Sequence, residues 1–341
     1  MITHKQLSLA DIFTDCQNKF DNDKYEFLEL LKNTINLDEI VPASFVSHFH
    51  AATGRPRRHL LYPMLKALLL QLIFSIPTTS LLIVFLKYSQ ELRNFCGFDV
   101  VPDASKFTRF KQDFLLDLQS MFDHLVDLTE PICQRINADK AAMVLFDTSG
   151  IEAWVTENNP KYANRIIRQL KAFKKAHNLD DSYDPYKAAY ASMPPHAAAN
   201  PAVQQMYING HFCYAYKFGI VTNGLGIVRD ISFYNKDFLN SHPEIIVGRM
   251  FYLYPEKNLR AYPGALRGTQ EWDATYKIRV NVEKSINHFK DSFCVAGRKT
   301  QNEKTLHADL LLAGIAQLVT VMVADKIHKH KYIHSLKPLI A

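Results

Sequence analysis

An acidic residue, Asp147, follows a short strand-like segment. Met143-Val144-Leu145-Phe146 is a short continuous apolar run that leads into Asp147-Thr148-Ser149-Gly150, a pattern that predicts a buried strand followed by a turn. An ionised carboxylate at the buried end of a strand is costly unless its charge is compensated, and coordination of a metal ion is one compensation. The alternative is a carboxylate that caps the turn through Ser149 or Gly150. The residues alone leave both roles open for Asp147.

A second group of reactive side chains recurs at helical spacing. Steps of three, four and seven residues separate Tyr276, Arg279, Glu283 and Lys290. On an α-helix these steps place all four side chains along one stripe. If that stripe were buried, each charge would need a partner. Periodicity alone favours the alternative, an exposed face held by salt bridges.

Cations gather in three segments. Gly54-Arg55-Pro56-Arg57-Arg58 resembles arms that read the minor groove of DNA, and a short helix is expected to begin after an N-cap at Asp103 or Ser105. Residues 161–175 hold six Lys or Arg and no acid, which predicts a basic stripe on a helix. The alternative for each segment is an ordinary solvated surface. The candidate DNA-contacting residues are Arg55, Arg57, Arg58, Lys106, Arg109, Lys111, Arg165, Arg168, Lys171 and Lys174.

The elements that must position these residues fall into two halves. From residue 23 to about residue 138 the apolar periodicity is helical, with breaks at Pro42, Gly54-Arg55-Pro56, Pro77 and Pro102. The second half contains the strand before Asp147, an irregular loop over residues 183–201, and two alternating runs joined through Asn223-Gly224, which predict a β-hairpin. The run from Leu306 to Val323 is apolar nearly all round and predicts a buried core helix.

Composition restricts the class of protein. The 341 residues carry a net charge of +6, which favours an anionic partner. The five cysteines show no C-x-x-C spacing, so neither a disulfide framework nor a thiolate zinc site is indicated. No secretory signal is recognised, and Lys66, Gln71 and Pro77 interrupt the most apolar stretch, Leu60 to Leu86. We therefore expect a protein of the reducing cytosol with no membrane partner.

Tyr276, Arg279, Glu283 and Lys290 resemble the signature of bacterial insertion-sequence transposases. That signature is Tyr-x-x-Arg-x-x-x-Glu-x-x-x-x-x-x-Lys, and this chain matches it at all four positions. These enzymes are of the DDE type and have an RNase H-like catalytic core. The sequences around Glu283 (Val282 to Lys290) and around Asp147 (Leu145 to Gly150) also look like that family, as does the helical part from Gly54 to Phe110. The resemblance covers roughly residue 40 to residue 325, in the expected order.

The resemblance implies a function and roles for these residues. In this family three carboxylates hold two Mg²⁺ or Mn²⁺ ions, which clamp the attacking and leaving oxygens of phosphodiester cleavage and strand transfer. By correspondence, Asp147 would be the first metal-binding carboxylate and Glu283 the last. Arg279 and Lys290 would neutralise phosphate near the cleaved bond, and Tyr276 would position the DNA end. The implied partners are the terminal inverted repeats of the element, bound by a homodimer. The implied location is the bacterial cytoplasm, in association with the nucleoid.

The implied fold is α + α/β. Residues 1–140 would form a helical N-terminal transposase domain that binds DNA. Residues 141–325 would form an RNase H-like core, a mixed sheet flanked by helices. Residues 326–341 would be a basic C-terminal tail.

One family feature is missing. The second catalytic Asp is expected on a strand after the hairpin, but the apolar run from Ile245 to Leu253 contains no acid. The acids on either side, none of them in a family-like context, are Glu244, Glu256, Glu271 and Asp273. The simplest hypothesis is an internal deletion with a junction near residues 247–248, which removes one strand. The two-metal site would then be incomplete, at a cost of at least about 10–100-fold in metal affinity or activity.

Three hypotheses remain open. The chain could be an active transposase in which Glu244, Asp273 or another acid replaces the missing Asp. It could be a catalytically dead derivative that binds DNA and inhibits the intact enzyme. It could also be a poorly folded remnant that neither binds nor cuts. We expect a transposase with impaired catalysis.

Overall fold

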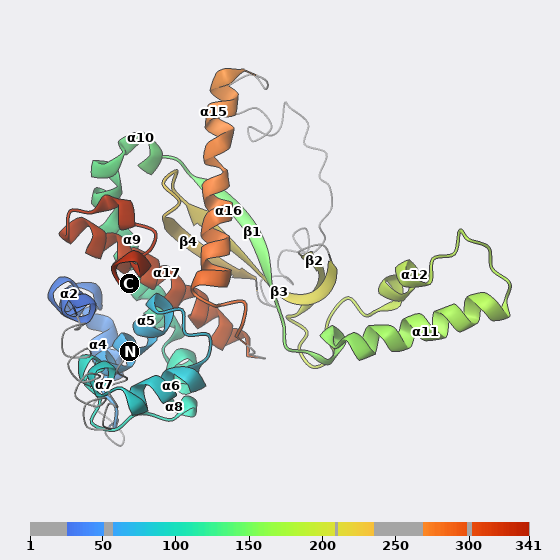
Figure 1. Cartoon of the computed structure of the whole chain (residues 1–341), viewed down its shortest axis with the longest axis horizontal. Helices are drawn as coiled ribbons and strands as arrows, with labels where there is room; N and C mark the ends of the chain where they lie inside the picture. The colour runs from blue at the N-terminus through green and yellow to red at the C-terminus, as the bar shows by residue number, and fades with distance from the viewer. Residues whose placement is uncertain (1–25, 51–56, 209–210, 235–268, 299–301, 341) are drawn as a thin grey trace, which may run out of the picture.

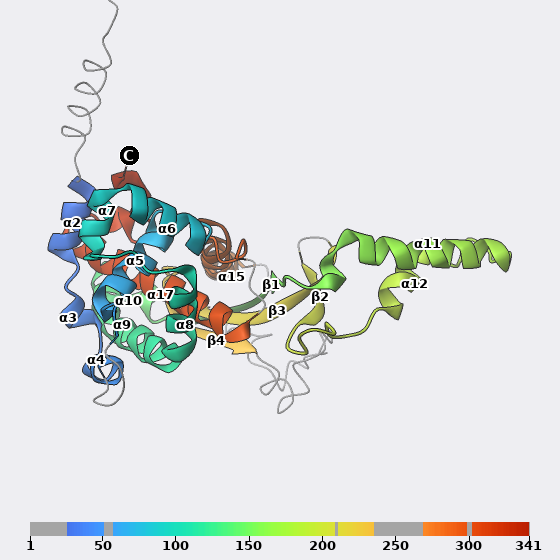
Figure 2. The same ribbon diagram turned by 90° about the horizontal axis from the view of Figure 1, so that it is seen from below.

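The structure is a computed structural model, and it describes residues 26–50, 57–208, 211–234, 269–298 and 302–340. A body of helices packs around one end of a small sheet, and a long arm extends from the other end (Figure 1). The view from below shows the arm standing away from the body as well (Figure 2).

The N-terminal half is helical, as its periodicity predicts. Its helices are α2 (Glu26–Thr34), α3 (Leu37–Ile40), α4 (Ala43–Phe49), α5 (Leu61–Ile73), α6 (Thr79–Tyr88), α7 (Gln90–Cys96), α8 (Ala104–Asp113), α9 (Leu115–Ile136) and α10 (Ala138–Ala141). The prolines mark the helix starts, because α4 begins after Pro42 and Thr78, which follows Pro77, caps α6 through its hydroxyl. Asp103 occupies the N-cap position of α8, one of the two residues predicted for it.

One long helix forms the centre of the body. Helix α17 (Glu303–Lys326) is apolar on all sides, and it packs against α9, α5, α8 and strand β4 (Val228–Tyr234). Its length and composition would suit a membrane span, but 94 % of its most apolar window is buried inside the molecule. The predicted core helix is therefore confirmed. Gly314 permits the close packing, because a Cβ there would lie 2.8 Å from Cδ1 of Ile231.

The sheet is built around strand β3 (His211–Thr222). Strand β1 (Leu145–Glu152) pairs with one edge of β3, and β2 (Gln204–Ile208) and β4 pair with different stretches of the other edge. The hairpin predicted through Asn223-Gly224 is confirmed as β3–β4, and Gly226 in its turn has a φ of +79°. All pairings among the strands that the structure describes are antiparallel. A mixed sheet also contains at least one parallel pair of strands, joined by a crossover connection. The described strands include no such pair. Residues 235–268, which follow β4, lie outside the described ranges.

Two local expectations are wrong. The strand does not end at Asp147: Val144 is 77 % exposed, and β1 starts at Leu145 and continues through Ser149 and Gly150 to Glu152. The reason is pairing, because β3 offers a partner for every residue of β1. Likewise, the stretch 183–201 is not wholly irregular, since it contains helix α12 (Pro185–Ser192), capped by the side chain of Asp184.

The arm lies between β1 and β2 in the chain. It consists of η1 (Thr156–Asn158), α11 (Pro160–Ala176) and α12, and α11 packs along α12. After the sheet, α15 (Gln270–Ile278) and α16 (Val280–Asn287) form one nearly continuous helical rod that ends in a π-helical turn, η2 (His288–Ser292).

The C-terminal segment folds back on the body. It contains the short turns η3 (His330–Tyr332) and η4 (Lys337–Leu339). Ile333 and Leu336 are buried in the same core as α17.

Candidate functional site

Asp147 lies within an edge strand of the described sheet. Its carboxylate is half-buried and accepts the backbone N–H of Thr148 at 2.8 Å. The register places Asp147 opposite Ile220, and Ile220 opposite Ile231, so the three side chains share one face of the sheet. Ile231 reaches α17 at Gly314 on that face. The side of β1 away from β3 pairs with no other strand in the described ranges. Because β1 continues through Ser149 and Gly150, Asp147 does not cap a turn there, which was one of the two roles that the sequence left open.

Glu283 is carried by a helix that packs on the same strand. Helix α16 contacts β1 and β3 through its buried side, which includes Val282 and Ile286, and Figure 1 shows it running beside β1. Ser285 Oγ donates to the carbonyl of Gly226 at 2.5 Å, which ties α16 to the β3–β4 turn. Glu283 itself is exposed. The fold thus brings together the two elements that carry Asp147 and Glu283.

Tyr276 and Arg279 lie side by side on the same rod. An Nη1–H of Arg279 donates to Tyr276 Oη at 3.1 Å, and its guanidinium lies 5.8 Å from the centre of the tyrosine ring. The indole ring of Trp272 stacks on the ring of Tyr276, with their centroids 4.7 Å apart. These contacts hold Arg279 and Tyr276 at an exposed position one turn before Glu283.

Lys290 departs from the predicted stripe. It lies in the π-helical turn η2, which has more residues per turn than an α-helix and therefore shifts its phase relative to Glu283. Its side chain is half-buried, and burial lowers the pKa of its ammonium group, against the opposing effects of Asp291 and Cys213. No feature of the sequence predicts this π-helical turn.

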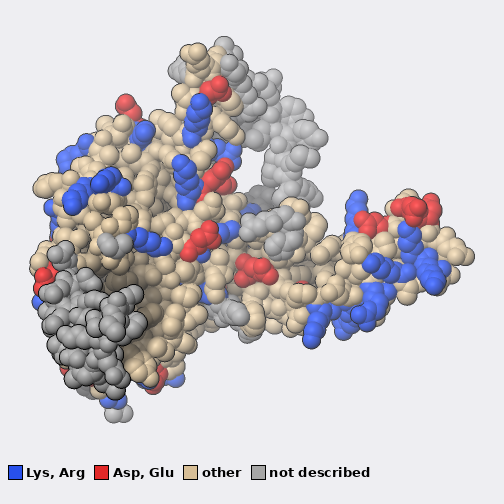
Figure 3. Space-filling view, in the orientation of Figure 1, with Lys and Arg blue, Asp and Glu red and all other residues tan. Residues whose placement is uncertain are grey.

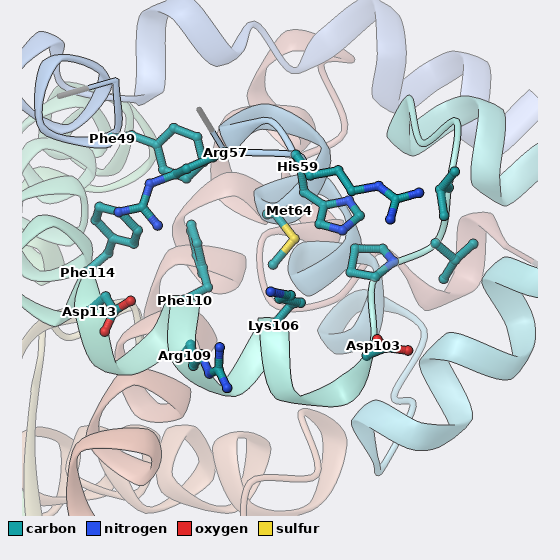
Figure 4. Close-up of a pocket in the computed structure, with 14 residues that line it drawn as sticks. Phe49, Arg57, His59, Met64, Asp103, Lys106, Arg109, Phe110, Asp113 and Phe114 are labelled. Carbon is teal, nitrogen blue, oxygen red and sulfur yellow. The ribbon is translucent and has the colours of Figure 1, made fainter. Parts of the chain in front are cut away.

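A groove of about 680 Å³ on the N-terminal helices collects four of the predicted cations (Figure 4). Arg57 and Arg58 reach it from the segment before α5, and Lys106 and Arg109 reach it from α8. We call this the basic groove. Two acids, Asp103 and Asp113, also line it, so cations exceed acids by four to two. The fold has joined two basic segments that lie about fifty residues apart in the chain.

Aromatic rings position one arginine of this groove. The Arg57 guanidinium lies 5.1 Å from the ring centre of Phe49 and 4.7 Å from that of Phe114, and Figure 4 shows it between the two rings. Such cation–π contacts fix the side chain while leaving its N–H groups available. Nearby, burial together with the charges of Arg58 and Lys106 lowers the pKa of His59. No motif in the sequence points to a role for Phe49, His59 or Phe114 in this groove.

Lys111 is buried, although it was predicted as one of the DNA-contacting residues. It is 3 % exposed, and its Nζ lies 2.6 Å from Oδ1 of Asp309 on α17. The helix α8 turns this residue inward, while Lys106 and Arg109 lie on its exposed side. Lys111 is therefore not part of a basic surface on α8. Arg55 lies outside the described residues.

The arm carries the third basic segment. Figure 3 shows Lys and Arg side chains gathered over it. Arg165 and Arg168 are exposed on α11. Lys171 donates to Tyr186 Oη on α12 at 2.7 Å, and Lys174 pairs with Asp181 at 3.2 Å. The predicted stripe is real, but two of its four cations also hold the arm together.

Of the four acids that are candidates to replace the second Asp, the structure describes the side chain of one, Asp273. Glu244, Glu256 and the proposed junction near residues 247–248 lie outside the described ranges, as does the side chain of Glu271. Asp273 is exposed on α15. Within the ranges that the structure describes, no group of three or more His, Cys, Asp or Glu side chains could hold a metal ion.

Comparison with known proteins gives one match. Residues 14–113 match a family model described as a transposase domain (DUF772). No curated protein and no solved structure matches the chain. The matched segment contains α2 to α8 among its described elements, and it holds both basic segments that line the basic groove. The match supports a transposase family for this protein.

Proposed function

We propose that this protein is a DNA transposase of a bacterial insertion sequence, of the DDE type, that binds the terminal inverted repeats of its element as a homodimer and has impaired catalysis. The observation that carries the proposal is the basic groove, because it lies inside the segment that matches a transposase domain.

The groove has the chemistry of a site for a phosphate backbone. Backbone contacts fix the position of a protein on DNA, and arginine, lysine and other donor side chains make most of them. Arg57 is held by two aromatic rings in a geometry that leaves its guanidinium N–H groups free to pair with phosphate oxygens. Arg165 and Arg168 on the arm form a second basic surface, separate from the basic groove. In this proposal one DNA duplex contacts both the basic groove and the arm.

The catalytic proposal rests on Asp147 and Glu283. Carboxylates suit Mg²⁺ or Mn²⁺, and the two residues lie on elements that pack against each other. The described residues do not supply the third carboxylate that a two-metal site of this family requires. The donor set thus fits an incomplete site. This incompleteness favours the second candidate, a DNA-binding derivative that inhibits the intact transposase.

DNA binding is tested first by titrating the full chain with a duplex that carries the ends of the element. Arg57→Ala and Arg109→Ala should each weaken binding and lower the slope of log K against log salt concentration by about 0.9, because each removes about one phosphate contact. Lys87→Ala, a change at an exposed lysine on α6, is the matched control and should leave the slope unchanged. Equal affinities for all four proteins would refute the basic groove as the DNA site.

Catalysis is tested on supercoiled plasmid that carries the same ends, in Mg²⁺ and in Mn²⁺. We expect no more nicking by the natural chain than by Asp147→Ala or Glu283→Ala. Nicking that both substitutions abolish would show instead that another acid completes the metal site. Binding without nicking would favour the DNA-binding derivative.

A further inference from the structure

A second groove, of about 760 Å³, lies on another side of α8. Hydroxyl groups from distant parts of the chain line it, and so does an indole ring: Thr78, Thr79 and Ser80 at the start of α6, Thr108 on α8, Thr305 on α17, and Trp154 just after β1. We call it the hydroxyl groove. Ser80, Thr108 and Trp154 are exposed, so the groove is open to solvent.

A cluster of two buried basic side chains and one buried carboxylate forms part of the wall of this groove. Lys111 and Arg298 both pair with the same oxygen of Asp309, with the Lys111 contact at 2.6 Å. All three side chains are more than nine-tenths buried, at 4 %, 7 % and 2 % exposed. Two basic side chains thus face one carboxylate, and Asp309 is the one acid among the described residues that line the groove. Burial lowers the pKa of Lys111, and the charge of Asp309 opposes this effect, as an anion in the groove would.

The arginine of this wall is incompletely bonded. Its Nε–H is buried and has no acceptor among the residues that the structure describes. Its Nη2 approaches the carbonyl of Phe293 only at 3.5 Å. A buried cation without full compensation is costly, and an anion in the groove would supply the missing negative charge.

Two helices also begin at the groove. Helix α6 has ten residues and is capped by Thr78, and α17 has twenty-four residues and is capped by Asn302. Both capping residues line the groove. The first N–H groups of a helix have no acceptor within the helix, and the helix dipole makes that end positive. Helix starts of this kind are common binding sites for phosphate groups.

We propose that the hydroxyl groove binds a phosphate group, and, resting on the function proposed above, that this phosphate belongs to the DNA backbone. Helix α8 then lies between two phosphate-binding grooves, with Lys106 and Arg109 facing one and Thr108 and Lys111 facing the other. A free phosphate compound is the other source of the same chemistry.

The first experiment measures the site without DNA. The melting temperature of the full chain is compared in inorganic phosphate and in chloride at equal ionic strength. We expect phosphate to raise the Tm by about 2 °C or more. Ser80→Glu should lower this difference, because it adds a carboxylate to the groove at a helix start, where an acid does not destabilise the helix. The part that remains comes from the basic groove and from the general stabilising effect of phosphate.

The matched control is Gln90→Glu, which makes the same change of charge at the exposed first residue of α7. It should keep the phosphate effect. A natural chain whose Tm is the same in phosphate and in chloride would overturn the site, as would a phosphate effect that is as large in Ser80→Glu as in Gln90→Glu.

The second experiment identifies the source of the phosphate. In a titration with duplex DNA, Ser80→Glu should lose one phosphate contact. Raising the salt concentration from 50 to 200 mM should therefore weaken its binding by a factor about 3.5 times smaller than the factor for the natural chain. An unchanged salt dependence, together with a phosphate effect on Tm that Ser80→Glu lowers and Gln90→Glu does not, would assign the site to a free phosphate compound and overturn the DNA assignment. If the natural chain binds no DNA, the function proposed above fails, and the Tm experiment still decides the site.

Discussion

At Asp309, two cations converge on one carboxylate oxygen inside the molecule. Asp309→Asn would leave Lys111 and Arg298 buried without a counter-charge, and breaking a buried pair in this way costs about 3–5 kcal/mol. Lys111→Met removes one of the two cations and leaves Arg298 paired, so it should cost much less. Urea denaturation of both variants measures the difference. A loss for Asp309→Asn no larger than for Lys111→Met would contradict this account of the cluster.

His307 makes stability depend on pH. Burial lowers the pKa of His307 from 6.5 to about 4, and its ring stacks on Phe233 at 5.1 Å. Between these two pH values the unfolded chain binds a proton that the folded chain does not, so the free energy of unfolding falls as the pH falls from 6.5 towards 4. His288, with a pKa lowered to about 4 chiefly by burial, acts in the same direction.

His307→Phe should therefore lose less stability between pH 7 and pH 5 than the natural chain does. The difference in slope is at most about 1.4 kcal/mol per pH unit. Urea denaturation at several pH values measures it, with His50→Gln, a change at an exposed histidine, as the control. Parallel pH profiles for His307→Phe and the natural chain would disprove the assignment.

At the scale of elements, Gly226 determines how α16 docks. Its φ of +79° is strained for any residue with a Cβ, and a Cβ there would lie 3.3 Å from the carbonyl of Asn281 on α16. Gly226→Ala should therefore lower the free energy of unfolding by about 1–2 kcal/mol. Gly297→Ala is the control, because the nearest atom to its Cβ would be 3.8 Å away. Equal unfolding midpoints in urea would argue against this docking.

The arm should contribute to DNA binding as a separate element. Arg165 and Arg168 are exposed on α11, so the double change Arg165→Ala/Arg168→Ala should leave the Tm unchanged while it lowers the salt slope of DNA binding by up to about 1.8. The control pair is Lys87→Ala/Lys329→Ala, which removes two exposed cations elsewhere. A slope that changes equally in both pairs would show a general effect of net charge and no specific role of the arm.

At the scale of the whole molecule, a single apolar core joins the two halves of the chain. Buried residues from Phe27 to Leu336 belong to one cluster, and α17 packs against both the N-terminal helices and β4. We therefore expect one cooperative thermal transition, with circular dichroism and tryptophan fluorescence giving the same midpoint. A gradual melt, or two separate midpoints, would favour the hypothesis of a poorly folded remnant.

Several features could be predicted from the sequence because their causes are local. Prolines and capping residues determine where α4, α6 and α8 begin. The pair Asn223-Gly224 determines where the chain turns between β3 and β4. An apolar surface all round a helix can only be buried, which placed α17 in the core. The transposase resemblance in the N-terminal part agrees with the matched family model.

Tertiary structure decided what depends on distant partners. The same basic segment sends Arg109 to a surface groove and Lys111 into the core, because α17 presents Asp309 to one side of α8 and not to the other. The strand β1 runs past Asp147 because β3 pairs with all of it, and the hydroxyl groove exists because two helix starts and a buried ion cluster meet there. Local propensity acts within a few residues, whereas burial and charge pairing act between segments that only the folded chain brings together.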